Sequence, residues 1–289
     1  MSAPPPYLWV LNPDAERELS STHSYAVRAA SVKRVEERRA LFDGLVQGDA
    51  MEFSHALSIR EQPTRALFWC PTPRVLAAAS QCGLLVGPAP TISVLRAVHD
   101  KRFISTALAE LTLPSRHIVS TEEQWKTLRA TTKGPLRLKR PFGYAGKGQR
   151  IWPEQGGEDR PWLADSLRLG GFVAEPHVTG ALELSQHGYL DARGLLLGQP
   201  CWLKTDKSSA PVSIEPALYV EPVIREQLKS IAEKAAHALG AAGYFGPFGI
   251  DALIVEGQAH LIDLNPRFTL GWSIGMGALR AEAIERALA

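Results

Sequence analysis

Short apolar runs and charged amphipathic stretches alternate in the first third of the chain. The apolar runs have the length of buried strands and lie at residues 7–11, 66–70 and 84–86. The amphipathic stretches show helical spacing and lie at residues 31–45 and 74–81. Because strands and helices alternate through short connections, this pattern predicts a small parallel α/β domain over residues 1–90.

The pattern after Pro90 predicts a second unit, over residues 91–173. Its predicted helices cover residues 91–110 and start again at residues 120–123, where hydroxyl side chains precede two acidic ones. Its predicted strands lie at residues 136–140 and 149–152, and a turn-rich segment follows at 153–161. The second unit is therefore expected to mix helices with a sheet.

The remaining residues, 174–289, predict a third unit. An apolar strand at residues 171–175 leads into it, and an extended region continues as far as residue 202. Apolar side chains then recur at helical spacing between residues 222 and 239, which predicts one long helix. Two apolar strands flank residues 256–258, and this arrangement predicts a hairpin with a three-residue loop.

Polar side chains interrupt this otherwise apolar hairpin. With a three-residue loop, Asp251 lies directly opposite Asp263, and strand alternation puts Asn265 on the same face as Asp263. Directly opposed carboxylates in a buried sheet repel each other, and burying them unpaired costs several kcal/mol. The pattern therefore predicts a positive charge between the two acids.

Two interpretations of that positive charge are open from the sequence. A divalent cation fits two carboxylates and an amide oxygen, and Mg²⁺ is commonly held by few carboxylates together with substrate phosphates. A structural salt bridge to Arg267 or to a nearby lysine satisfies the same charge balance. Either interpretation depends on the register, because a slip of one residue would move Asp263 to the other face.

A glycine-rich connection follows a strand lysine in the second unit. Lys139 precedes Gly143, Gly146 and Gly148. Glycine lets backbone N–H groups approach phosphate oxygens, and the ammonium group of Lys139 supplies a neutralising cation. A simple turn explains the glycines equally well. The Walker phosphate loop, the dinucleotide-binding glycine pattern and the protein-kinase motifs are absent from the sequence.

Composition narrows the class of protein. The chain has 289 residues, 45% of them hydrophobic and 21% charged, and 32 basic residues against 30 acidic ones give a net charge of +2. This balance argues against nucleic acid as a partner. No apolar run reaches the ~20 residues that span a bilayer, no signal peptide is evident, and the cysteines form no C-x-x-C pair. We expect a cytoplasmic enzyme with no membrane partner.

Four of these features, taken in order, resemble the ATP-grasp superfamily of ligases. They are Asp100-Lys101 in a predicted helix, Lys139 with its glycine-rich connection, the acids Glu175 and Glu183 in FVAEPHVTGALELS, and the strands GIDALIV and HLIDLNPR. The resemblance implies an α/β protein with the ATP-grasp fold, in which two α+β lobes grip a nucleotide beside a small N-terminal α/β domain. It implies an N-lobe with a glycine-rich lid over residues 91–173 and a C-lobe with the metal site over residues 174–289.

The resemblance also implies roles for individual residues, with ATP and Mg²⁺ as cofactors. The residues that would bind the phosphates, the adenine edge and the ribose are Lys101, Lys139, Gly143, Gly146, Gly148, Glu175, His177, Val178 and Glu183.

Asp251, Asp263 and Asn265 would bind Mg²⁺, and Arg267 and Lys139 would be the catalytic groups near the transferred phosphoryl group. Most members of the superfamily have Glu-x-Asn where this chain has Asp263-x-Asn265. The shorter acid would place a metal nearer the strand, or would hold it by a single oxygen.

We therefore expect an ADP-forming ligase that joins a carboxylate to an amine through an acyl-phosphate, with small molecules such as amino acids as substrates. A catalytically silent nucleotide-binding module with a regulatory or scaffolding role is one alternative, and an ATP-grasp phosphotransferase is another. The sequence leaves open a homo-oligomer, the number of metal ions, and the roles of Lys204 and Lys207. His99, His177 and His187 could serve in proton transfer, although packing is the commoner role of a lone histidine.

Overall fold

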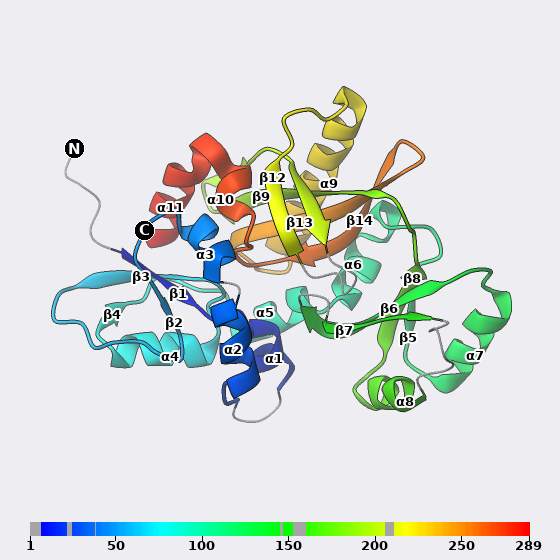
Figure 1. The fold of residues 1–289 in the computed structure, drawn as a ribbon, viewed down its shortest axis with the longest axis horizontal. Helices are drawn as coiled ribbons and strands as arrows, with labels where there is room; N and C mark the ends of the chain where they lie inside the picture. The colour runs from blue at the N-terminus through cyan, green and yellow to red at the C-terminus, as the bar shows by residue number, and fades with distance from the viewer. Residues whose placement is uncertain (1–6, 22–24, 38, 145–146, 153–159, 206–210) are drawn as a thin grey trace.

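The structure is a computed structural model, and it describes residues 7–21, 25–37, 39–144, 147–152, 160–205 and 211–289. The strands of these described residues form three sheets, which lie in different parts of the chain. The first sheet lies with the blue and cyan helices, the second is green, and the third combines the yellow and orange strands (Figure 1). Both α-helices and β-sheets are thus present, as the sequence predicts.

The N-terminal sheet is parallel and has the strand order β2-β1-β3-β4. Its strands are β1 (Tyr7–Leu11), β2 (Met51–Phe53), β3 (Thr64–Phe68) and β4 (Leu84–Leu85), and its helices are α1 (Ala15–Ser20), α2 (Ala29–Glu37), α3 (Arg39–Val46) and α4 (Pro73–Gln81). Parallel strands and helices are present in this part of the chain, as its pattern predicts, while the domain bounds of 1–90 stay a prediction. The short elements β2 and α1 were not predicted, because three and six residues carry too little periodic pattern.

The second sheet is antiparallel and has the order β5-β8-β6-β7. Its strands are β5 (His117–Val119), β6 (Leu136–Tyr144), β7 (Lys147–Trp152) and β8 (Phe172–Pro176), with the helices α7 (Glu122–Thr131) and α8 (Arg160–Arg168) beside them. The predicted helix start at residues 120–123 is confirmed, because Thr121 and Gln124 form a capping box. Trp125, Trp162 and Phe172 fill a separate core here.

The helix predicted over residues 91–110 is wrong as one element. It consists of α5 (Ile92–His99), α6 (Arg102–Ala107) and a 3₁₀ turn (Ala109–Leu111). The break occurs at Asp100, whose backbone is extended with ψ of 122°. Its carboxylate accepts the backbone N–H of Arg102 at 2.8 Å, which stabilises the start of α6. Lys101 consequently lies at a junction between helices, and not within a helix.

The third sheet has the main order β12-β11-β9-β13-β14, and β10 pairs with β9. Its strands are β9 (Leu182–Asp191), β10 (Gly194–Leu197), β11 (Cys201–Thr205), β12 (Pro211–Pro216), β13 (Gly246–Val255) and β14 (Gln258–Asn265). The helices α9 (Pro222–Ala241), α10 (Trp272–Met276) and α11 (Arg280–Leu288) accompany it, with a 3₁₀ turn at Gly277–Leu279. One core joins this sheet to the N-terminal helices, with Trp9, Phe268 and Trp272 at its centre.

Membrane-spanning helices need a long, continuous apolar sequence. None of the helices in the described part of the chain has the length and apolar character that crossing a membrane requires.

The hairpin of β13 and β14 differs from its prediction in one respect. Its loop has two residues, Glu256 and Gly257, because Val255 pairs with Gln258. Both loop residues have positive φ, 50° and 74°, as in a type I′ turn. A bulge between the pairs of Asp251 and Ala252 then shifts the register by one residue, so Asp251 still lies opposite Asp263. The predicted pair is therefore correct, although the predicted loop is not.

The two-residue turn predicts different effects of alanine at two glycines. A Cβ atom at Gly257 or at Gly44 meets no atom within 4 Å, but only Gly257 has a positive φ. We expect Gly257→Ala to lower the free energy of unfolding by roughly 1–2 kcal/mol. Gly44→Ala, in an exposed part of α3, should raise it by about 0.5–1 kcal/mol. Urea unfolding of both variants measures this, and a Gly257→Ala protein as stable as wild type would contradict the turn.

Candidate functional site

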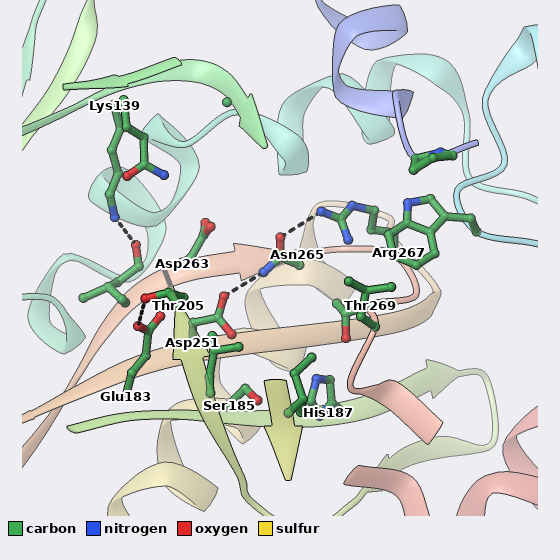
Figure 2. Close-up of a pocket in the computed structure, with 18 of the residues that line it drawn as sticks. Lys139, Glu183, Ser185, His187, Thr205, Asp251, Asp263, Asn265, Arg267 and Thr269 are labelled. Atoms are coloured by element: carbon green, nitrogen blue, oxygen red, sulfur yellow. Dashed lines mark hydrogen bonds between the residues drawn. The ribbon is translucent and has the colours of Figure 1, made fainter. Parts of the chain in front are cut away.

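A cavity of about 360 Å³ lies where the three sheets meet. Its wall includes Lys139 from β6, Glu175 from β8, Glu183 from β9, the hairpin acids, and residues from the N-terminal sheet such as Trp69. Figure 2 shows Asp251, Asp263, Asn265 and Lys139 around one part of it. Segments that are far apart in the sequence thus line a single, partly open cavity.

The end of the hairpin brings together the three predicted metal ligands. Asp251 lies directly opposite Asp263, and the amide nitrogen of Asn265 donates a hydrogen bond to Asp251 at 3.1 Å. On its other side Asp251 lies opposite Ser185 of β9. The convergence expected from strand alternation is present, whereas the metal-binding role of these residues stays a prediction.

The resemblance implies that Lys101 binds a phosphate, but in the structure Lys101 is paired with Asp263. Its ammonium group donates a hydrogen bond to Asp263 Oδ1 and forms an ion pair with it. Lys101 is 6% exposed, and it is not among the described residues that line the cavity. The salt bridge that was one of the two interpretations of the hairpin acids therefore exists, with Lys101 as the partner of Asp263.

The two opposed acids have different electrostatic environments. Burial raises the pKa of Asp251, and the charges of Asp263 and Glu183 raise it further. Burial also acts to raise the pKa of Asp263, but Lys101 and Lys139 outweigh it, so this pKa is lowered. Asp263 thus holds its negative charge easily, whereas Asp251 lacks a cationic partner of comparable strength.

Lys139 is held by a buried charge network. Its Nζ atom lies 2.5 Å from Glu175 Oε1 and donates a hydrogen bond to the carbonyl oxygen of Ile262 at 2.9 Å. Arg116 Nη1 lies 2.5 Å from the other oxygen of Glu175. Burial lowers the pKa of Lys139, and Glu175 opposes this effect. The network orients the ammonium group toward β14, and no sequence pattern identified Arg116 as a member.

The predicted nucleotide-binding residues divide into two groups. Those that line the cavity are Lys139, Gly143, Glu175, Val178 and Glu183. His177 and Gly148 are outside this lining among the described residues, and Gly146 lies outside the described part of the chain. The ring of His177 lies 3.3 Å from Arg137 instead. The structure thus places five of the nine predicted residues along the cavity, and Lys101, Gly148 and His177 away from it.

Arg267 lines the cavity, and its guanidinium is held by several partners. It donates hydrogen bonds to Glu16 at 2.6 Å, to Asn265 Oδ1 at 3.2 Å and to the carbonyl oxygen of Phe268 at 3.0 Å. It also lies over the ring of Trp69 at 4.9 Å. Glu16 comes from the unpredicted helix α1, and no sequence pattern marked it as a site residue. A phosphoryl-contacting role for Arg267 stays a prediction.

The two lysines with open roles lie on β11 and just beyond it. Lys204 is exposed, and its ammonium group lies 3.1 Å from Glu215. Lys207 lies outside the described residues. The exposed position of Lys204 fits a solvated lysine better than a phosphate ligand.

Three neutral polar side chains line another part of the cavity. The polar atoms Ser185 Oγ, His187 Nδ1 and Thr269 Oγ1 are buried and have no hydrogen-bond partner among the described residues. Figure 2 shows the three side chains near one another, on β9 and after β14. Of these three residues only His187 was a candidate from the sequence, because a single serine or threonine carries no pattern.

Glycines surround the ring of His187. A Cβ atom at Gly275 would lie 2.4 Å from His187 Nδ1, and Cβ atoms at Gly249 and Gly271 would each lie 3.0 Å from ring carbons. The absence of these Cβ atoms makes room for an imidazole in the sheet interior. Burial lowers the pKa of His187 to about 4, so its ring is neutral at physiological pH.

Asp251, Asp263 and Asn265 are the candidate ligands of a metal ion. Within the described residues no three histidine, cysteine, aspartate or glutamate side chains form a metal-holding group. Asp251 and Asp263, with the amide oxygen of Asn265, fit Mg²⁺ because this ion is commonly held by one or two carboxylates and completed by substrate phosphates. The raised pKa of Asp251 agrees with an unmet need for positive charge at this position.

Neither a protein-family model nor a curated protein sequence matches the chain. Solved structures do resemble it. A biotin carboxylase from Campylobacter jejuni, in a complex with β,γ-ATP, has a TM-score of 0.60 at 13% identity over 97% of this chain and 70% of that one. A D-alanine–D-alanine ligase from Helicobacter pylori has a TM-score of 0.57 at 12% identity over 98% of both chains.

An N5-carboxyaminoimidazole synthetase from Staphylococcus aureus, complexed with ADP, has a TM-score of 0.52 at 11% identity and covers 91% of this chain and 71% of that one. All three are ATP-grasp enzymes, and the likeness shows that this chain has the ATP-grasp fold. The resemblance found in the sequence is thereby confirmed at the level of the fold.

Burial of neutral histidines predicts how stability depends on pH. The pKa values of His187 and His99 are both lowered from 6.5 to about 4 by burial. The unfolded chain therefore binds protons at a higher pH than the folded chain, and stability should fall as the pH falls from 6.5 to 4. Each histidine contributes up to about 1.4 kcal/mol per pH unit.

Urea unfolding of His187→Gln over this pH range tests the effect. The slope of stability against pH should be smaller than in wild type. His237→Gln is the matched control, because His237 is exposed on α9. An unchanged slope in His187→Gln would contradict the buried neutral imidazole.

Proposed function

We propose that the chain is an ATP-dependent ligase that joins a carboxylate to an amine through an acyl-phosphate and releases ADP and phosphate. The observation that carries this proposal is the convergence of Lys139, Asp251, Asp263 and Asn265 on one cavity. The ATP-grasp fold supports the same conclusion, because two of the similar structures are complexes with β,γ-ATP or with ADP. A cytoplasmic location and small-molecule substrates belong to the proposal.

The nucleotide is proposed to lie between the lobes of residues 91–173 and 174–289, with residues 1–90 forming the remaining wall. Lys139 supplies a buried cation near the phosphates, and Gly143 allows a close approach of the backbone there. Val178 and Glu183 contact the nucleoside. Lys101 acts through Asp263, because its ammonium group is paired with that carboxylate.

Asp251, Asp263 and Asn265 would hold Mg²⁺, which when bound would neutralise phosphate charge. Lys139 keeps positive charge beside this position in a partly enclosed space, where electrostatic effects are stronger than in water. Arg267, whose charge is balanced by Glu16, is proposed to donate hydrogen bonds to the transferred phosphoryl group. The network of Glu175 and Arg116 fixes the ammonium group of Lys139 before substrate binds. Catalysis then depends on positioning and on fixed charge, as in other phosphoryl transfers.

The reaction is tested with hydroxylamine in place of the unknown amine. A carboxylate oxygen attacks the γ-phosphorus and ADP leaves; the nitrogen of hydroxylamine then attacks the acyl carbon, phosphate leaves, and the nitrogen loses a proton. We expect ADP and hydroxamate in equal amounts, dependent on a carboxylic acid and Mg²⁺. ADP without hydroxamate or free phosphate would indicate a phosphotransferase instead. Absence of ADP with every acid would indicate a silent nucleotide-binding module.

The unequal environments of the two acids predict unequal effects of neutral substitutions. In EDTA, Asp263→Asn leaves the ammonium group of Lys101 buried and unpaired, and the free energy of unfolding should fall by up to about 3 kcal/mol. Asp251→Asn removes a repulsion and should leave stability unchanged or raised. Urea unfolding of both variants measures the difference.

Both substitutions should also abolish the rise in melting temperature that Mg²⁺ and ADP give to wild type. This second readout does not depend on turnover. Thermal unfolding with and without Mg²⁺–ADP provides it. A full Mg²⁺-dependent shift in Asp251→Asn would remove this residue from the proposed metal site.

A further inference from the structure

The cavity extends past the hairpin acids toward the N-terminal sheet. The lining of this extension, here called the inner end, has the apolar residues Pro13, Val27, Val32, Phe42, Trp69 and Leu270, beside the polar residues Asp14, Ser31, Ser54 and His55. Phe42 and Trp69 are buried and pack edge to face, with ring centroids 5.6 Å apart. An apolar wall of this kind favours an apolar part of a ligand, by roughly 25 cal/mol per Å² of surface removed from water.

The charged side chains of the inner end already have partners. Asp14 accepts a hydrogen bond from the hydroxyl group of Tyr25 at 2.7 Å and lies 3.7 Å from Arg74. Arg267 donates to Glu16 at 2.6 Å. A ligand with a second charge would therefore find no uncompensated Lys, Arg, Asp or Glu among the described lining residues of this end. Burying such a charge unpaired costs several kcal/mol.

Neutral polar side chains, by contrast, line the cavity between the hairpin acids and the apolar residues of the inner end. Ser185 Oγ, His187 Nδ1 and Thr269 Oγ1 are buried without hydrogen-bond partners among the described residues. Burial keeps the ring of His187 neutral, since its pKa is lowered to about 4. Unpaired buried polar atoms are costly, and a small shift of the side chains would let an uncharged hydrogen-bonding group of a ligand satisfy Ser185 Oγ or Thr269 Oγ1. His187 Nδ1 faces the backbone of Gly275 instead.

We propose that the inner end selects a monocarboxylate substrate whose body is uncharged, with apolar groups against Trp69 and Phe42 and a neutral polar group near Ser185 and Thr269. The inference rests on the proposed function, because the single carboxylate of this substrate is the one that becomes the acyl-phosphate. Dicarboxylates and phosphorylated acids should bind more weakly, because the described lining residues of the inner end include no unpaired lysine or arginine.

Three acids of nearly the same shape test the inference. 4-Methylpentanoate, succinamate and succinate differ only in carrying an isopropyl, a carboxamide or a carboxylate end group. Binding of each is measured by ligand-observed NMR titration with Mg²⁺ and β,γ-methylene-ATP present. We expect 4-methylpentanoate and succinamate to bind at least ten-fold more tightly than succinate. Equal or tighter binding of succinate, or no binding of any of the three, would overturn the inference.

Substitutions in the wall should change this order in a predictable direction. Val32→Lys adds a cation and should improve succinate binding at least ten-fold while weakening 4-methylpentanoate. Val27→Lys serves the same purpose if the first variant does not fold. Val223→Lys on α9 is the matched control, because Val223 is exposed and outside the lining. An equal gain for succinate in the control would contradict a local effect.

A second substitution tests the neutral polar atoms separately. Thr269→Val removes a hydroxyl group with little change in shape. It should weaken succinamate several-fold and leave 4-methylpentanoate unaffected. Equal effects on both acids would remove Thr269 from the recognition of the polar group.

The hydroxamate assay on the same acids separates this inference from the proposed function. If uncharged acids bind preferentially and no hydroxamate forms, the ligase proposal fails and the selectivity of the cavity stands. If hydroxamate forms faster with succinate than with the uncharged acids, the ligase proposal stands and the selectivity fails.

Discussion

The opposition of two carboxylates in the β13–β14 hairpin is the constraint on which the arrangement of the cavity depends. Asp251 and Asp263 face each other across the strands, so positive charge must reach them from elsewhere. Lys101 comes from the junction of α5 and α6, and Lys139 comes from β6. Because these elements lie far from the hairpin in sequence, charge balance at two acids stabilises the contact between the second sheet and the third. The partly open cavity lies beside this contact.

The compensation is uneven, and the unevenness gives the site its chemical character. Asp263 receives an ammonium group and the backbone N–H of Leu264 at 2.9 Å. Among the described residues, Asp251 receives a side-chain hydrogen bond from the amide of Asn265 alone. Burial and the charge of Asp263 therefore raise its pKa, whereas Lys101 lowers that of Asp263. An aspartate at position 263 suits this pairing, because a side chain longer by one methylene would carry the carboxylate about 1.5 Å farther from its own backbone. The unmet charge at Asp251 is then the one that a cation can complete.

The sequence predicts the features that depend on neighbouring residues better than those that depend on contacts between distant segments. Strand and helix periodicity located α9 and most strands, because the spacing of apolar residues within each element indicates its type. The hairpin loop was predicted with one residue too many. A bulge compensates for the shorter loop, so the predicted pair of acids is correct although the bulge itself was not predicted. The destination of Lys101 and the contributions of Arg116 and Glu16 were not predictable. Each depends on a side-chain contact across many residues, and no periodic pattern marks such contacts.

Arg267 connects the two ends of the cavity and explains why they differ in charge. Arg267 follows β14, where the acid cluster requires positive charge. Its shortest hydrogen bond, however, is the one to Glu16 of α1, and its guanidinium lies over the ring of Trp69. This pairing anchors the N-terminal sheet to the third sheet and, by the same contact, neutralises the arginine. The cavity is consequently charged beside the hairpin and neutral beyond it. Selection of an uncharged substrate body would then result from the interaction that holds the N-terminal wall in place, and a change in that selection would need a change in the way the wall is held.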